Sequence, residues 1–428
     1  QAAAWDAWRQ SPASAFGFVE AWGAAALAKL ARASFPSTRA TAGPEREGLQ
    51  ARAALRPRFD LMEQEPQRAA ELAHSVLRAM GLLQDFPALV LLVGHGSRTT
   101  NNPHAAGLAC GACGGQSGEL NARVLAALLN DREVRGRLAA LGIAIPDATH
   151  FLAALHDTVT DDVDCFDVAE IPSSLEPPTR RLLAALRQAG ERVRAERAES
   201  LGLQRLVDRP AALAQALRRR ANDWSELRPE WGLAGNAAFI AAPRTRTRGL
   251  DLEGRAFLHD YDWRHDPDGS VLELVMTAPM VVAHWINFQY LASTTAPQRF
   301  GSGSKVLHNV VGGRIGVFEG NGGDLRIGLP WQSVHDGTRL RHEPLRLAVF
   351  IEAPRAMIDA VLRQHAKVRL LVDNGWLHLL RLDAASAFVE RYDRGLWRPL
   401  EGEASWADAL AAPRLAQGAG HEPRVSRL

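Results

Sequence analysis

Cysteine is scarce in this sequence, with only three in 428 residues. Three cysteines cannot build the disulfide framework of a small secreted domain, so the sequence predicts a reducing, cytoplasmic compartment. There is no run of 18 or more apolar residues, which favours a soluble or peripheral protein over one that spans a membrane. An initial methionine and a signal sequence are also lacking, and we expect an amino-terminal portion to be missing.

An excess of charge of either sign is lacking too. Fifty basic residues nearly cancel 48 acidic ones, leaving a formal net charge of +2. A protein that attracts nucleic acid electrostatically has a strongly positive net charge, so nucleic acid is excluded as a partner. The hydrophobic share of 46% is that of an ordinary globular protein, and the length allows two or three domains of roughly 100–200 residues each.

Apolar spacing along the chain alternates between two periods. Apolar residues at helical spacing predict helices over 65–83 and over 117–142, and Ser117 is predicted to be the N-cap of the second helix. Short apolar runs predict strands at 88–93, 149–157 and 164–171. This order predicts an α/β fold with a mainly parallel sheet core and additional helical and α+β regions. The expected domains are a helical segment and linker at 1–60, an α/β region with the site at 61–222, and an α+β region packed on it at 223–428.

The most informative stretch is "LVLLVGHGSRTTNNPHAAGLACGACGG", residues 89–115. The predicted buried strand 88–93 runs into the glycine-flanked His95, and two cysteines among glycines, Cys110 and Cys113, follow. Imidazole nitrogen and thiolate sulfur are the ligands that zinc prefers, and sites in α/β sheets lie at the carboxyl ends of strands. The stretch therefore predicts a zinc site that uses His95 and Cys110, with His104 and Cys113 as further candidates. The C-x-x-C pair alone also fits a redox dithiol.

Two other groups leave alternatives open. His156 is followed by several aspartates, and it either belongs to a strand-end polar network or supports the site or its substrate. Cys165 reads as a small buried hydrophobe. A structural zinc has four protein ligands, whereas a catalytic zinc keeps one position for water, and the loop alone does not decide between them.

Longer strings then occur in one order: "GHGS", "CGACGG", "FLAALHDTVTD", "APMVVAHWINFQYLAST" and "FGSGSKVLHNVVG". This set resembles the carboxyl-terminal half of the DabA family, the large soluble subunits of bacterial inorganic-carbon transporters. The resemblance implies a sheet core like that of β-carbonic anhydrase and one zinc per chain held by two cysteines, an aspartate and a histidine. His95 and Cys110 match two of these ligands. The other two belong to a C-x-D-x-R motif, which this sequence lacks, and they are expected from an absent amino-terminal portion.

The function that the resemblance implies is energy-coupled uptake of inorganic carbon. Zinc lowers the pKa of bound water to roughly 7, and the resulting hydroxide would hydrate CO₂ to bicarbonate. The partner would be a membrane-embedded proton- or cation-translocating subunit related to antiporters, with this chain peripheral at the cytoplasmic face of the inner membrane. Carbonic-anhydrase-like activity would depend on that partner. The candidate residues around the ligands are Ser97, Arg98, Asn101, Asn102, Cys113 and His156.

Two rival functions remain at this stage. "LLVGHGSR" also resembles the first strand of sirohydrochlorin-type chelatases, but a chelatase would carry the motif near its start and a second metal-facing histidine in a later half. The second rival function is that of a non-catalytic scaffold with a structural zinc. The segment "FGSGSK" misses the spacing of a phosphate-binding P-loop, so we expect a turn-rich loop there.

Overall fold

The computed structural model describes most of the chain after residue 63. The described stretches are 64–99, 109–110, 113, 116–222, 233–304, 308–311, 316–319, 325–326, 328–383 and 388–400, with single positions between 14 and 60. The chain forms two compact units: residues 1–66, 86–134 and 146–229 in unit 1, and residues 67–85, 135–145 and 230–428 in unit 2. The domain boundaries at 60 and 222 stay a prediction.

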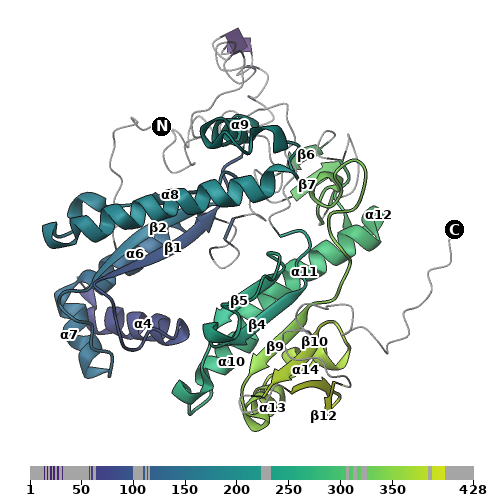
Figure 1. Cartoon of the computed structure of the whole chain (residues 1–428). Coiled ribbons are helices and arrows are strands. Elements are labelled where there is room, and N and C mark those ends of the chain that lie inside the picture. The colour runs from purple at the N-terminus through teal and green to yellow at the C-terminus, as the bar shows by residue number, and fades with distance from the viewer. Residues whose placement is uncertain are drawn as a thin grey trace. The chain divides into compact units, whose positions relative to one another are not determined.

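Unit 1 is built on a three-stranded sheet of order β1-β2-β3. The strands are β1 (Leu89–Gly96), β2 (His150–Asp157) and β3 (Asp162–Cys165). β1 and β2 run side by side in parallel, as the aliphatic sequence predicted, whereas β3 is antiparallel to β2 (Figure 1). The sheet is therefore mixed.

The strand predicted over 164–171 was only partly right, because β3 ends at Cys165. Asp167 has a left-handed φ of 54° and precedes a 3-10 turn at Val168–Glu170. The guanidinium of Arg123 holds both carboxylate oxygens of Asp167, at 3.0 and 2.8 Å. This bidentate pair fixes the chain in the turn and ends the strand.

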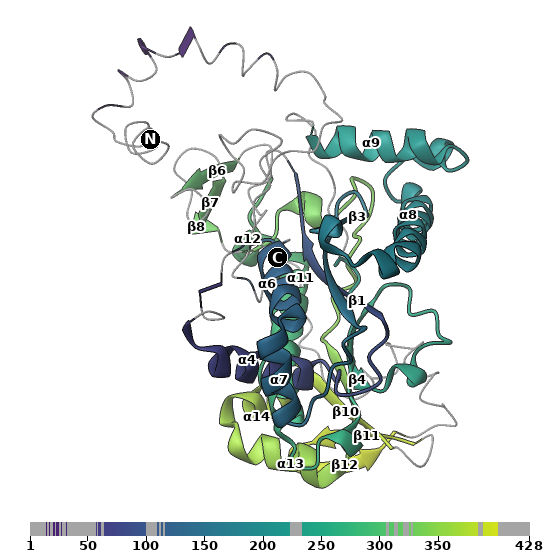
Figure 2. The same cartoon turned by 90° about the vertical axis from the view of Figure 1, so that its left-hand side faces the viewer.

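Helices cover the sheet of unit 1, and Figure 2 shows the sheet between α6 and α8. The helices are α6 (Glu119–Asn130), α8 (Glu176–Ala198) and α9 (Pro210–Asn222). Asp131 divides the predicted helix 117–142, because its backbone is extended and its carboxylate caps the Val134 N–H of α7 (Arg132–Ala140). The prediction that Ser117 is the N-cap of α6 was wrong by one residue, because the N-cap is Gly118 and carries no side-chain cap. The Ser117 hydroxyl instead accepts the Glu119 N–H at 3.1 Å, one residue before the cap position.

Unit 2 contains a six-stranded mixed sheet of order β12-β11-β10-β9-β4-β5. The strands are β4 (Ala238–Ala242), β5 (Ala256–Asp260), β9 (Ala348–Glu352), β10 (His378–Leu382), β11 (Val389–Asp393) and β12 (Leu396–Pro399). The run from β10 to β5 is parallel, and β11 and β12 add an antiparallel edge. A separate small sheet consists of β6 (His308–Val311), β7 (Gly316–Glu319) and β8 (Leu325–Arg326).

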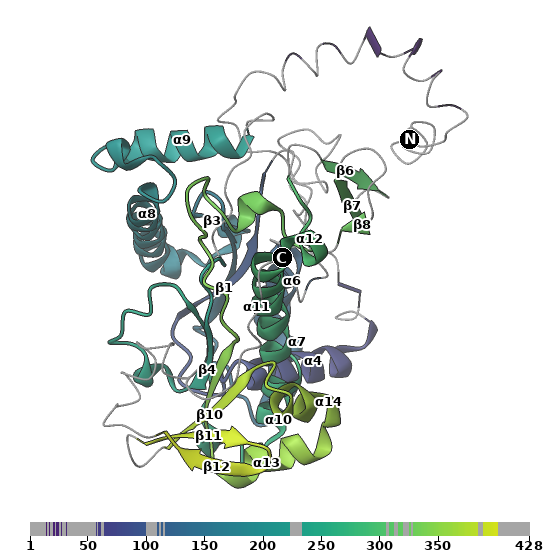
Figure 3. The same ribbon diagram turned by 90° about the vertical axis from the view of Figure 1, so that its right-hand side faces the viewer.

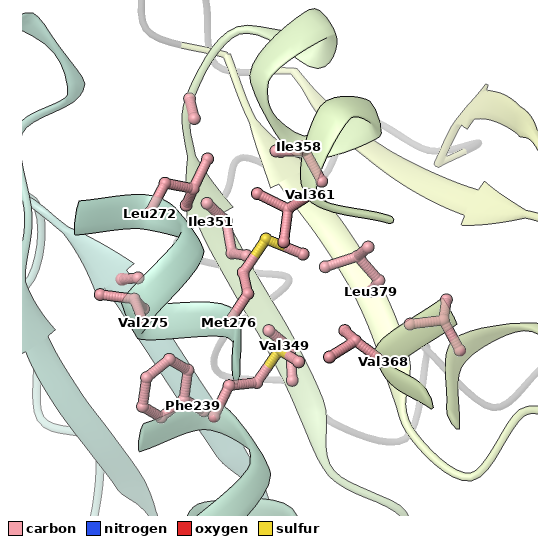
Figure 4. Close-up of a cluster of buried hydrophobic side chains, with 14 of the residues drawn as sticks. Phe239, Leu272, Val275, Met276, Val349, Ile351, Ile358, Val361, Val368 and Leu379 are labelled. Atoms are coloured by element: carbon pink, nitrogen blue, oxygen red, sulfur yellow. The ribbon is translucent and has the colours of Figure 1, made fainter. Parts of the chain in front are cut away.

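The helices of unit 2 pack their apolar faces on one side of the large sheet (Figure 3). They include α10 (Ser270–Thr277), α11 (Pro279–Thr295), α13 (Arg355–Gln364) and α14 (Ala366–Asp373); α4 (Pro66–Ala79) and α12 (Pro297–Phe300) complete the described α-helices from residue 64 onward. Figure 4 shows Met276 of α10 between Ile351 of the central strand β9 and Val361 of α13. Burial of each such side chain contributes about 1.5–3 kcal/mol to stability.

The string "APMVVAHWINFQYLAST" forms α11. Among the described residues, Ser270–Thr295 is the one helical stretch whose length and mean hydropathy of 1.4 would allow it to cross a membrane. Pro279 begins α11 after a break at Ala278, and Met280 and Ala283 pack in the core of unit 2. Core helices of soluble proteins pass the same length and composition test, so this stretch is weak evidence for a span.

Candidate metal centre

His95 lies near the carboxyl end of β1, in register with His156 on β2. Its backbone carbonyl accepts the Gly118 N–H at 2.9 Å. Its imidazole forms a hydrogen bond with the backbone carbonyl of Ala109, the residue before Cys110. The structure thus brings the strand end and the cysteine loop together, although they are fifteen positions apart in the sequence.

Two glycines permit this close approach. A Cβ atom on Gly94 would lie 2.5 Å from the Gly118 carbonyl oxygen, and a Cβ atom on Gly118 would lie 2.9 Å from the His95 backbone nitrogen. Neither residue needs a left-handed backbone, because Gly118 has a φ of −73° and no such angle occurs at Gly94. The glycines are required for the space that they leave.

The cysteine loop is held by its own backbone. The Cys110 N–H donates to the Gln116 carbonyl at 2.9 Å in an antiparallel bridge, and the Cys113 N–H donates to the Cys110 carbonyl at 3.1 Å. The two thiols are within hydrogen-bonding reach of each other. The amide of Asn121 on α6 donates to the Cys113 sulfur at 3.2 Å.

The surroundings of His95 and Cys113 shift the pKa values of both side chains. Burial lowers the pKa of His95, a lowering that the bond to Ala109 opposes and the nearby His156 reinforces, although the side chain keeps access to solvent. The neutral imidazole favoured in this way is the form that binds metals. Burial and the neighbouring Cys110 raise the pKa of Cys113 to about 11, so Cys113 keeps its proton.

His156 belongs to a strand-end polar network, as one of its two readings predicted. Its Nε2 lies 3.3 Å from Asp161 Oδ1, and the other carboxylate oxygen of Asp161 pairs with Arg197 of α8. Burial alone would raise the pKa of Asp161, but the hydrogen bonds from His156 and Arg197 outweigh it and lower that pKa. Asp161 is therefore a buried carboxylate that stays ionised.

A cavity of about 610 Å³ adjoins this network within unit 1. It is lined by β3 and by α8 and α9, with Asp161 and Asp162 among its walls. Arg218 holds Asp162 with Nε and Nη2 at 3.0–3.1 Å, and Arg194, almost fully buried, contacts the same carboxylate at 3.3 Å. Asp162 offsets one of these two positive charges, and further carboxylates line the cavity beside its other arginines: Asp157, Asp161, Asp164 and Glu191. The lining therefore has no surplus of positive charge with which to attract an anion.

The family model described as "Probable inorganic carbon transporter subunit DabA" matches residues 1–377. The chain belongs to the DabA family. Proteins with that same description are 64% identical over 333 residues in Ectopseudomonas mendocina, 55% over 399 in Methylovorus glucosotrophus and 52% over 405 in Chloroflexus aggregans.

These alignments cover 78%, 93% and 92% of this DabA chain but only 41%, 46% and 48% of the three relatives. The chain therefore spans about half the length of the curated relatives it matches. No solved structure matches the chain. The α/β class is confirmed, with mixed sheets, and the likeness of the core to β-carbonic anhydrase stays a prediction.

The donors that the DabA chain offers fit zinc in kind, because His95 supplies nitrogen and Cys110 supplies sulfur. Within the part of the chain that the structure describes, no group of three or more histidine, cysteine, aspartate or glutamate side chains could hold a metal ion. The described residues thus hold at most half of a tetrahedral ligand set. Asp167, two residues after Cys165, does not complete it, since Arg123 occupies both oxygens of that carboxylate.

The other candidates around the ligands divide into three groups. Arg98 pairs with Asp164 at 3.0 Å. The hydroxyls of Ser97 and Thr99 are buried and have no hydrogen-bond partner among the described residues. Such orphaned groups next to His95 are consistent with a further group that completes the site. Asn101, Asn102 and His104 lie outside the described residues.

Sequence reasoning missed the residues that act through long-range contacts. Asn121 contacts the Cys113 sulfur, and Asp161 and Arg197 fix His156. Asn121 stands in the string "NAR", so its place shortly after the cysteine loop was a usable signal. The pairing of Asp161 with Arg197, by contrast, joins residues 36 positions apart, and no local pattern predicts it.

Proposed function

We propose that this chain is the carboxyl-terminal part of an inorganic-carbon uptake subunit in which His95 and Cys110 supply two of the four ligands of a zinc ion that hydrates CO₂ to bicarbonate. The observation that carries the proposal is the hydrogen bond from the His95 ring to the Ala109 carbonyl, which places the imidazole beside the residue that precedes Cys110. The description of the relatives supports the transport role.

Neighbouring residues of the chain would orient the two zinc ligands, the His95 ring nitrogen and the Cys110 thiolate. The Ala109 carbonyl accepts a hydrogen bond from one ring nitrogen of His95, which leaves the other nitrogen free for a metal. The bridge between Cys110 and Gln116 fixes the backbone from which the thiolate projects. A zinc ion held there would supply Lewis acidity that lowers the pKa of water to roughly 7, so that a nucleophile for CO₂ exists at neutral pH.

Two ligands from this chain leave the choice between an open, catalytic zinc and a closed, structural one to the ligands expected from elsewhere in the protein. The inorganic-carbon transport role in the relatives' description favours hydration chemistry over the scaffold reading. Membership of the DabA family favours the transporter over the chelatase reading.

The partner and location follow from the same proposal. Relatives described as transporter subunits work within a complex, and the subunit that couples CO₂ hydration to energy would be membrane-embedded, translocate protons or another cation and resemble antiporters. This chain would bind it from the cytoplasmic face of the inner membrane. Such coupling would drive hydration in one direction and so concentrate bicarbonate.

The test is metal content together with stopped-flow CO₂ hydration, using the protein at its full natural length with its membrane partner. We expect one zinc per chain, and loss of zinc and activity in His95→Ala and in Cys110→Ala. Cys165→Ala is the matched control and should keep both. Unchanged zinc in a folded His95 or Cys110 variant would remove that residue from the ligand set, and zinc without any hydration activity would favour the scaffold reading.

A further inference from the structure

The proposed zinc site uses Cys110 and leaves Cys113 without a chemical role. Both cysteines are free and half-buried, so a small reagent can reach them. The hydrogen bond from the Cys113 N–H to the Cys110 carbonyl closes a four-residue turn, which keeps the Cα atoms of such residues within 7 Å of each other. Disulfides join Cα atoms about 4.4–6.8 Å apart, and here the thiols already lie within hydrogen-bonding reach.

We propose that Cys110 and Cys113 form a redox modification site, at which a disulfide oxidant such as oxidised glutathione converts the two thiols into an intramolecular disulfide. The inference rests on the proposed function in one respect: the disulfide would remove the Cys110 sulfur from the zinc ligand set. The modification itself needs only the two thiols.

The chemistry is two successive thiol–disulfide exchanges. One cysteine thiolate attacks a sulfur of the oxidant, which forms a mixed disulfide and releases one glutathione thiolate. The second cysteine then attacks the cysteine sulfur of the mixed disulfide, which forms the Cys110–Cys113 bond and releases the second glutathione thiolate. The two thiol protons leave with these thiolates, and the two electrons reduce the oxidant to two glutathione molecules.

Asn121 is placed to assist at one of the two sulfurs. Its amide N–H donates to the Cys113 sulfur at 3.2 Å, and such a donor stabilises negative charge on that sulfur as it enters or leaves a disulfide. Cys113 is not a proposed ligand, so zinc does not withdraw it from exchange. The third cysteine, Cys165, is the last residue of β3, pairs in register with Ala154 and serves as an internal control.

Zinc and oxidant would therefore compete for the Cys110 sulfur. A thiolate bound to zinc is protected, and a sulfur bonded to Cys113 no longer carries the charge that a zinc ligand needs. Oxidation would release zinc, and a thiol reductant would restore the site. The pair would thus switch off the proposed hydration under oxidising conditions.

The experiment treats the full-length protein with oxidised glutathione, follows zinc release with a chromogenic chelator and maps disulfides by peptide mass spectrometry. We expect a peptide linked through Cys110 and Cys113, and zinc loss at least fivefold faster than without oxidant, reversed by dithiothreitol and added zinc. Cys113→Ser should form no such link and lose zinc no faster with oxidant than without. Cys165→Ser should behave as the wild type.

Two results would overturn the inference. One is the absence of the Cys110–Cys113 link in oxidised wild type, a result that does not depend on how any variant folds. The other is oxidant-driven zinc loss in Cys113→Ser at the wild-type rate. A link that forms without zinc release would support the modification site while contradicting the proposed role of Cys110 as a ligand, so the two proposals fail separately.

Discussion

At the scale of single residues, β1 can approach the loop before α6 closely only because Gly94 and Gly118 have no side chains. An added Cβ at Gly94 would meet a backbone oxygen at 2.5 Å, and backbone cannot swing aside as a flexible side chain can. The same contact positions His95, whose carbonyl binds Gly118. Glycine here therefore serves both stability and the site.

We predict that Gly94→Ala lowers the free energy of unfolding by about 1–3 kcal/mol, because the strand or the loop must shift to relieve the overlap. The same shift should weaken zinc binding. Gly136→Ala is the matched control: an added Cβ there meets nothing within 4 Å, and alanine in a helix should stabilise by about 0.5–1 kcal/mol. Urea unfolding measures both, and equal stability of the two variants would contradict the account.

His342 gives a pH-dependent prediction in unit 2. Burial, then the charge of Arg255, lower its pKa from 6.5 to about 4, while Glu343 opposes them. Its Nδ1 accepts the Gly235 N–H at 3.0 Å and would lose that bond on protonation. The unfolded chain binds the proton more tightly, so the neutral histidine stabilises the fold above pH 6.5, and this stability is lost as the pH falls towards 4.

The size of the effect follows from the shift, at about 3 kcal/mol between pH 7 and pH 4. His342→Asn keeps an acceptor for Gly235 but cannot be protonated, so it should lose that much less stability over the same range. The measurement is urea unfolding at a series of pH values, with the variant's curve subtracted from that of the wild type. A difference that does not change with pH would show that His342 is protonated as readily in the fold as in the unfolded chain.

Sequence alone named His95 and Cys110 as candidate zinc ligands because their residue types and glycine-rich surroundings are unusual for a strand end, and their role as ligands stays a prediction. It could not predict Asp161, Arg197 or the orphaned hydroxyls, because these depend on which distant segments meet. Cys165 was predicted to be a small buried hydrophobe, but it is only half-buried at the end of β3. Partial burial, and then Asp164, raise its thiol pKa. Local chemistry is legible in sequence, whereas tertiary partners are not.

At the scale of elements, one side chain attaches α6 to the sheet of unit 1. The last ladder bond from the β3 side runs from the Phe166 N–H to the Ala153 carbonyl. Beyond it, the side-chain amide of Asn130 forms the hydrogen bonds that a neighbouring strand would otherwise form with Phe151. It donates to the Phe151 carbonyl at 2.8 Å and accepts the Phe151 N–H at 2.9 Å. Asn130 therefore fixes how α6 lies on β2.

We predict that Asn130→Ala destabilises unit 1 by about 2–4 kcal/mol, because two backbone groups of a buried residue lose their partner. The exposed Gln188 on α8 offers a control, since Gln188→Ala should change stability by no more than about 0.5 kcal/mol. Hydrogen exchange of the Phe151 amide measures the local effect directly. Equal protection of that amide in both variants would contradict the proposed role of Asn130 in fixing α6 on β2.

The elements themselves were largely legible in the sequence. Helical spacing predicted α4 and α6, and the aliphatic run predicted β1 as a parallel strand. The failures lie where side-chain contacts decide the backbone. Arg123 holds Asp167 and ends β3, and the cap at Asp131 divides one predicted helix in two. Both contacts are specific pairings that apolar periodicity does not record.

At the scale of the whole molecule, composition and element order sufficed for the α/β class but not for the sheets. The order β12-β11-β10-β9-β4-β5 places β9 beside β4, which comes more than 100 residues earlier in the chain. Pairing at that separation leaves no local trace in sequence. The prediction of a mainly parallel core therefore missed the antiparallel β3 and the antiparallel edge strands β11 and β12.

The span of the chain gives a whole-molecule prediction. We propose that the remaining zinc ligands come from the part of the relatives' length that this chain does not match. The 428-residue chain alone should then bind zinc roughly 100-fold more weakly than the full-length protein, or worse, since loss even of groups that only orient ligands costs 10–100-fold. Competition with a calibrated chelator measures this, with circular dichroism as the control for folding. Equal affinity would contradict the proposal.

The most direct test of the central claim is zinc K-edge X-ray absorption on the full-length protein. We predict a four-coordinate shell with sulfur at about 2.3 Å and a histidine nitrogen at about 2.0–2.1 Å. The sulfur contribution should fall in Cys110→Ser, and the imidazole contribution should disappear in His95→Ala. A shell that keeps its sulfur and imidazole signals in both variants would show that these two side chains do not share a metal ion.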